Sequence, residues 1–141
     1  MIVDRHQIEE LLPHGPGMVL LDRVLSCDGE TILCAADSHR NPDNPLRRNG
    51  RLPAMAAIEY AAQAAALHGA LGGQRAAGAG AVLGGVKDVR ATPQDLAEIE
   101  GTLAVRATLL LAQDNGAVYS FEVGSQSGAA LVEGRFTVMY K

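Results

Sequence analysis

The sequence predicts an α+β fold in which an antiparallel sheet wraps around one long, Ala-rich central helix. Residues 52–71 (LPAMAAIEYAAQAAALHGAL) predict the helix, because they are rich in helix-forming alanine, start with a proline and are followed by two glycines. The only charged side chain between residues 52 and 74 is Glu59. A segment this apolar would be costly to leave in water, so we expect the sheet to cover it and Glu59 to be a carboxylate buried in the core.

The residues before this helix predict a short helix and two strands. Asp4 can cap the short helix, Gln7 can complete a capping box, and Pro13 ends it. The turn at 14–17 then leads into the first strand. An Asp-Gly hairpin turn and a long loop with two prolines and three asparagines follow. The predicted segments are a strand at 18–26, the turn at Asp28-Gly29, a strand at 31–36 and a loop at 37–51.

After the central helix, residues 74–80 predict a flexible connection, and about four strands follow. Gly84-Gly85 weakens the first of them and suggests a close approach by another backbone or a ligand. The next strand alternates, which places its apolar residues 103, 105, 107, 109 and 111 on one face. The predicted strands and breaks are 81–89, a break at 92–95, a strand from 103, a turn at 114–116, strands at 117–124 and 129–140, and a turn at Ser127-Gly128.

Composition limits the class of protein. The 141 residues suit a single domain spanning 1–141, and the formal net charge of −4 provides no general attraction for nucleic acid or for an anionic membrane. The charged N-terminus does not resemble a signal peptide, and no segment is apolar enough to span a membrane, so we expect a cytoplasmic protein. Cys27 and Cys34 are interpreted as free thiols rather than a disulfide, and a metal site with His39 is disfavoured by the spacing.

Three motifs, in order, resemble the hotdog-fold 3-hydroxyacyl-[acyl-carrier-protein] dehydratases. They are LLPHGPGMVLLDRVL (11–25), LPAMAAIEYAAQAAA (52–66) and VLGGVKDVR (82–90). The helix motif is similar to that of the aryl-polyene-type subgroup. The resemblance implies a hotdog fold, a dimer with its sites between subunits, and an acyl carrier protein as partner. It departs at one place: the GHFPG loop that carries the family's catalytic histidine is absent, and NPDNPLRRNGRLP stands there instead.

Dehydration of a 3-hydroxyacyl thioester needs a base, an acid and a group that holds the thioester oxygen. Glu59 and Gln63 match the glutamate and glutamine of the family helix, and Gln63 lies one turn after Glu59 on the same face. The alternative interpretation is a polar pair that only fixes the helix register. Backbone N–H groups around Ala54, at the predicted helix start, could polarise the thioester carbonyl.

The missing acid or base leaves two histidines to consider. His39 lies in the loop before the helix and is either functional or simply solvated. His14 matches the histidine of the family's first motif and is a turn-stabilising group first and a base second. His68 is expected to be structural, and His6 to lie on the surface of the first helix.

Four arginines, including Arg47 and Arg48, crowd the loop at 37–51 of an otherwise acidic chain. A solvated loop is the plain interpretation. The functional one is a docking surface for an acidic acyl carrier protein with a phosphopantetheine-linked substrate. We therefore expect a dehydratase without metal or organic cofactor, forming a homodimer or a heterodimer with another hotdog protein. The alternatives are a catalytically degenerate subunit that needs an active partner, and an acyl-thioester thioesterase or binding module.

Overall fold

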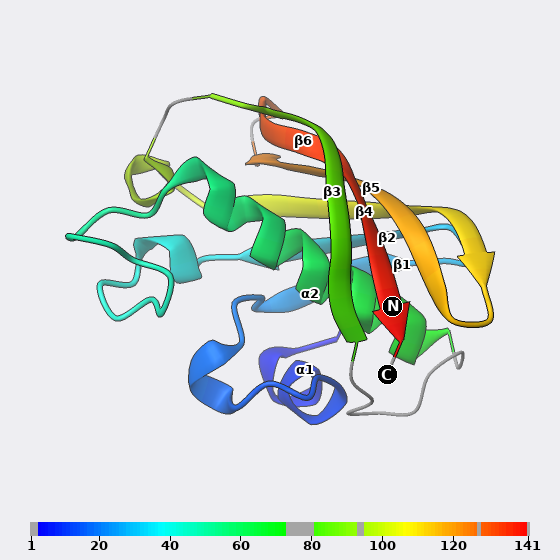
Figure 1. Ribbon diagram of the computed structural model, residues 1–141. Helices are drawn as coiled ribbons and strands as arrows, with labels where there is room; N and C mark the ends of the chain where they lie inside the picture. Colours follow the sequence, from blue (N-terminus) through cyan, green and yellow to red (C-terminus); the bar gives the residue numbers. More distant parts are fainter. Residues whose placement is uncertain (1–2, 73–80, 93–94, 127, 141) are drawn as a thin grey trace.

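A computed structural model of the protein describes residues 3–72, 81–92, 95–126 and 128–140. The predicted connection at 74–80 lies outside these ranges, as do parts of the predicted breaks at 92–95 and 127–128. One antiparallel sheet of six strands, in the order β1-β2-β4-β5-β6-β3, curves around the long helix α2 (Figure 1). The elements are α1 (Arg5–Leu11), η1 (Pro16–Met18), β1 (Arg23–Cys27), β2 (Thr31–Ala36), η2 (Ser38–Arg40), η3 (Ala54–Ala56), α2 (Ala57–Leu71), β3 (Ala81–Ala91), η4 (Leu96–Glu98), β4 (Leu103–Gln113), β5 (Gly116–Ser125) and β6 (Ala130–Tyr140).

The N-terminal helix confirms the predicted capping box. The Asp4 carboxylate accepts a hydrogen bond from the Gln7 backbone N–H at 2.9 Å, and the Gln7 side chain accepts one from the Asp4 N–H at 3.1 Å. Ile8 is fully buried, so α1 packs on the domain through one face.

The first strand is shorter than predicted, because β1 begins only at Arg23. Before β1, the Asp22 N–H already bonds to the Ala35 carbonyl of β2, but the backbone groups of Met18 and Leu20 bond to side chains instead of to a neighbouring strand. The Leu20 N–H donates to Gln63 and the Leu20 carbonyl accepts from Ser38, while the Met18 carbonyl accepts from Gln63. A strand predicted from apolar pattern alone takes no account of such competing partners.

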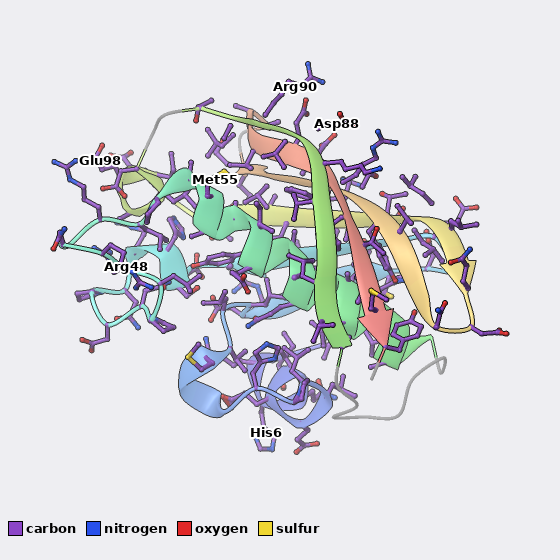
Figure 2. The ribbon with its side chains drawn as sticks, viewed as in Figure 1. His6, Arg48, Met55, Asp88, Arg90 and Glu98 are labelled. Atoms are coloured by element: carbon purple, nitrogen blue, oxygen red, sulfur yellow. The ribbon has the colours of Figure 1, made fainter. Side chains whose placement is uncertain are left out.

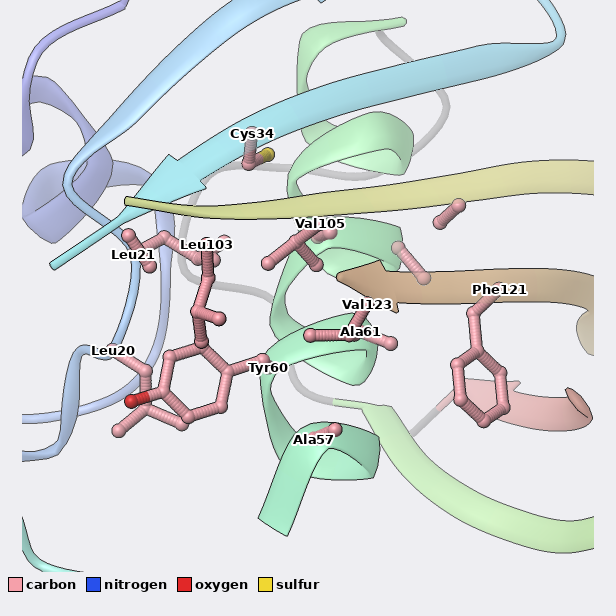
Figure 3. Packing of buried hydrophobic residues seen from close by; sticks show 14 of the residues in the cluster. Leu20, Leu21, Cys34, Ala57, Tyr60, Ala61, Leu103, Val105, Phe121 and Val123 are labelled. Carbon is pink, nitrogen blue, oxygen red and sulfur yellow. The ribbon is translucent and has the colours of Figure 1, made fainter. Parts of the chain in front are cut away.

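The central helix also begins later than predicted. Residues 54–56 form a turn of 3₁₀ helix, and α2 itself starts at Ala57. Its alanines allow close packing against the sheet, where Ala61 lies near Val105 and Val123 (Figure 3). The helix packs mainly on β2, β4 and β5.

The last strands follow the predicted meander with one correction. A bulge between Leu109 and Leu111 interrupts the alternation of β4. Leu111 therefore faces away from the helix and is 51% exposed, whereas Leu103, Val105 and Ala107 are buried as predicted. In β3, the group that approaches Gly84 closely is a side chain of the same sheet, since a Cβ there would lie 2.9 Å from the Met139 side chain, and a Cβ at Gly85 would have no neighbour within 4 Å.

Both cysteines are free, as predicted. In the β1–β2 pairing Cys34 lies opposite Val24 and Cys27 opposite Ile32, so the two thiols are not cross-strand partners. Among the described residues, no helix is long and apolar enough to cross a membrane.

Candidate functional site

Glu59 lies in the first turn of α2 and is exposed. The prediction of a carboxylate buried in the core is therefore wrong for the single chain. The sheet covers the helix faces that carry Ala57, Tyr60 and Ala61, all fully buried, and leaves the face that carries Glu59 open.

Exposed apolar side chains lie one helical turn before Glu59 and on β3. Met55, one turn before Glu59, is 53% exposed. Leu83 and Val86 of β3 are 38% and 39% exposed, although they pair with residues of β6 whose side chains are buried on the helix-facing side of the sheet. β3 ends the sheet, so its outer edge has no strand partner among the described residues. Exposed apolar surface next to a free strand edge is typical of an interface.

Gln63 does not pair with Glu59. Its side-chain oxygen accepts from the Leu20 N–H at 2.9 Å, and its side-chain nitrogen donates to the Met18 carbonyl at 2.8 Å. With 4% of its surface exposed, Gln63 fixes the segment before β1 against the helix. The interpretation of Glu59 and Gln63 as a mutually satisfied pair is wrong.

A hydrogen-bonded chain that the sequence did not indicate joins the helix to the loop at 37–51. The Ser38 hydroxyl donates to the Leu20 carbonyl at 2.6 Å, so its oxygen is left to accept from the Tyr60 hydroxyl at 2.8 Å. The Tyr60 oxygen in turn accepts from the Asn44 amide at 3.0 Å. Burial raises the pKa of Tyr60. No spacing in the sequence reveals this chain, because its members come from three separate segments.

His39 is fully buried, so the interpretation as a solvated loop histidine is wrong. Its Nε2 lies 3.0 Å from the Ile99 carbonyl, which can only accept, so Nε2 carries the proton and Nδ1 keeps its lone pair. Nδ1 is buried and has no hydrogen-bond partner among the described residues. Burial lowers the pKa of His39, which favours the neutral ring. The ring makes no hydrogen bond with Glu59 in the described chain.

The other histidines do not complete a site with Glu59 either. His14 is exposed in the turn before η1. His68 is structural as expected, because its Nδ1 lies 2.8 Å from the Tyr119 hydroxyl and its Nε2 2.8 Å from the Asp28 carbonyl. His6 lies on the surface, 2.9 Å from Glu10.

The two arginines predicted to bind a partner have different surroundings. The Arg47 guanidinium donates to the backbone carbonyls of Asn41, Gly50 and His39 at 2.9–3.2 Å, so it holds the loop together. The predicted role of Arg47 in binding a partner is therefore not supported. Arg48 is exposed and projects from the loop before α2 (Figure 2).

Arg48 lines an open cavity of about 530 Å³ at the start of the central helix, together with Arg51, Ala54 and Met55. The backbone N–H groups of Ala54 and Met55 have no hydrogen-bond partner in the described parts of the chain. The predicted oxygen-binding position at Ala54 thus lies on a cavity wall. Within the described ranges, no group of three or more His, Cys, Asp or Glu side chains is placed to hold a metal ion.

A sheet wrapped around one long helix is the hotdog fold, and solved structures of that fold match this chain. The chain of the dehydratase heterocomplex ApeI:P from Xenorhabdus doucetiae is 26% identical, with a TM-score of 0.81 over 95% of this chain and 90% of that one. Thioesterases from Pseudomonas aeruginosa (16% identical, TM-score 0.66, 99% and 96% covered) and Haemophilus influenzae (14%, 0.66, 97% and 90%) share the fold. The search of curated proteins gave no match.

The family assignment comes from the sequence comparison. The ApeP dehydratase family matches residues 6–141, almost the whole chain. The protein therefore belongs to the ApeP-like dehydratases, which confirms the resemblance to hotdog dehydratases of the aryl-polyene type.

Proposed function

We propose that this chain takes part in the dehydration of 3-hydroxyacyl thioesters carried on acyl carrier protein, in fatty acid- or polyene-type biosynthesis in the cytoplasm. The observation behind the proposal is that a chain of the ApeP-like dehydratase family presents Glu59 on the open face of its central helix. Glu59 would serve as acid or base on the substrate, and the N–H groups at Ala54 and Met55 would hold the thioester oxygen.

The proposal requires a second hotdog subunit. The described chain has no histidine hydrogen-bonded to Glu59: His39 is committed to the Ile99 carbonyl, and His14 lies in an exposed turn. The ApeI:P neighbour is a heterocomplex, and the free β3 edge with its exposed Leu83 and Val86 supports a similar partner here. We propose a heterodimer in which the other subunit supplies the missing acid or base.

A partner would also change the surroundings of Glu59. A subunit that covered the open helix face would enclose the Glu59 carboxylate together with the exposed Met55 and would remove water from it. A desolvated carboxyl group is better suited to proton transfer near neutral pH than one in water. The exposure of Glu59 in the single chain is then a property of the unassembled subunit.

The test is a dehydration assay with a 3-hydroxyacyl carrier-protein substrate. The chain is assayed alone and after co-expression with a second hotdog protein, as wild type, as Glu59→Gln and as Glu100→Gln, an exposed control that lies outside the helix. We expect activity with the partner, a loss of roughly 10²-fold or more for Glu59→Gln, and no change for the control.

Three results would contradict the proposal. Full activity of the Glu59→Gln complex would remove Glu59 from the chemistry. Undiminished activity of the chain alone would make the second subunit unnecessary. Release of free thiol without loss of water would identify a thioesterase instead, a function for which the distant thioesterase neighbours support the fold only.

A further inference from the structure

A two-residue turn in the loop before α2 places two arginines side by side. Asn49 and Gly50 have φ angles of 53° and 76°, the left-handed pair that defines a type I′ hairpin turn. Arg48 and Arg51 flank it and exchange both backbone hydrogen bonds, at 2.8 and 3.0 Å. Residues paired in this way lie directly opposite each other, and their side chains leave the backbone on the same side.

This arrangement is unfavourable without a counter-charge. Two like charges at directly opposite positions destabilise a pair of strands. The side chain of Arg48 makes a hydrogen bond only to the backbone carbonyl of Arg47, at 3.1 Å, and that of Arg51 has no hydrogen bond or ion pair among the described residues. An anion placed between the two guanidinium groups would turn the repulsion into attraction.

The cavity of about 530 Å³ offers the space for such an anion. Both arginines line it, and so do Ala54 and Met55 with their unpartnered N–H groups. Among the described residues on its wall, one is acidic: Asp95, whose Oδ1 accepts from the backbone N–H groups of Leu52 and Ala97 at 2.9 and 3.0 Å. Two guanidinium groups and one carboxylate among the described lining residues give the wall a net positive charge, in a chain that is acidic overall.

We propose that this cavity binds the phosphodiester group of the pantetheine arm on which the acyl substrate arrives. The inference rests on the proposed function, since it assumes an arm-borne substrate. Guanidinium groups bind phosphate oxygens in a fork-like, two-bond geometry. Arg48 and Arg51 hold the phosphate, whereas Arg47, with its three bonds to backbone carbonyls, only maintains the shape of the loop.

The experiment compares two soluble probes by nuclear magnetic resonance titration of the full chain. 4′-Phosphopantetheine carries a phosphate that stands in for the phosphodiester, and pantetheine lacks it. The variants are Arg48→Gln with Arg51→Gln, and, as a control with the same loss of charge, Arg40→Gln with Arg106→Gln, both exposed and outside the cavity. Circular dichroism verifies the fold of each variant.

We expect the wild type to bind phosphopantetheine at least tenfold more tightly than pantetheine, with a preference that weakens in high salt. The Arg48/Arg51 double variant should reduce the preference to less than threefold, and the control pair should retain it. Equal affinity of the wild type for both probes, or an equal loss in the control pair, would overturn the inference.

The outcome is separable from that of the proposed function, because the titration needs no turnover. A phosphate preference that depends on Arg48 and Arg51 in a complex that does not remove water supports this site and contradicts the dehydratase proposal. Dehydration with no phosphate preference contradicts this site alone.

Discussion

The hydrogen bonds of Gln63 provide a quantitative test of how the helix holds the segment before β1. In Gln63→Leu the Leu20 N–H loses its acceptor, and Leu20 is only 3% exposed, so water cannot replace it. A buried donor left unsatisfied costs about 1–3 kcal/mol. The bond to the Met18 carbonyl is only partly buried, so water can replace Gln63 there and the loss adds little. We therefore expect the free energy of unfolding to fall by about 2 kcal/mol.

Urea unfolding of the wild type, Gln63→Leu and Gln113→Leu measures this difference. Gln113 is exposed at the end of β4, so its substitution should change stability by less than about 0.5 kcal/mol. A Gln63→Leu value within about 0.5 kcal/mol of this control would refute the assigned hydrogen bonds.

Gln63→Glu adds a pH-dependent form of the same test. A protonated carboxyl group can accept from the Leu20 N–H and donate to the Met18 carbonyl, whereas a carboxylate faces that carbonyl with a lone pair. The pKa in the folded chain should therefore be raised above the ordinary value of about 4.3. The stabilisation by the protonated carboxyl group is then present below the ordinary pKa and is lost as the pH rises through the folded pKa. A stability deficit that does not grow between pH 4 and pH 8 would contradict this reasoning.

Three further predictions concern other parts of the chain. Burial lowers the pKa of His39. Its contribution to stability should therefore be complete above the unfolded pKa of about 6.5 and fall as the pH drops below that value. Measured by urea unfolding, the free energy of unfolding should depend less on pH between 7.5 and 5.5 in His39→Gln than in the wild type, and His14→Gln should not show this change. Burial raises the pKa of Cys34 to about 12. In Cys27→Ser, where Cys34 is the remaining thiol, a thiol reagent at pH 8 should therefore react only after denaturant is added. Rapid reaction of the folded variant would contradict the buried position of Cys34. Asp4→Ala should lower the free energy of unfolding by about 1 kcal/mol, measured by thermal unfolding, because the capping box is lost.

The sequence predicted those elements whose signals are local. The capping box of Asp4 and Gln7, the Asp28-Gly29 hairpin and the strand Thr31–Ala36 were found where expected. In each case neighbouring residues satisfy one another's backbone groups, or alternate between two faces, so a few consecutive positions contain the whole signal. The family resemblance rested on motifs of the same local kind.

The site was less predictable because its features depend on distant partners. Glu59 was identified as the one charge in an apolar helix, but its exposure depends on which helix face the sheet covers. Gln63 was matched with Glu59 by helical spacing, yet its amide bonds to Met18 and Leu20, 45 and 43 positions away. Arg47 and Arg48 are adjacent in the sequence, but only the folded loop shows that one is a clamp and the other lines a cavity.

By itself, the sequence determined the order of the elements and the Ala-rich helix with Glu59 on it, because these follow from short-range pattern and composition. It indicated the hotdog class through the resemblance of three motifs to known dehydratases. Only the tertiary structure decided that Glu59 lies on an open face, that His39 is buried as a neutral ring, and that Arg48 and Arg51 stand together over the cavity. Burial and hydrogen-bond partners are set by segments far apart in the chain, so they appear only once those segments are packed against one another.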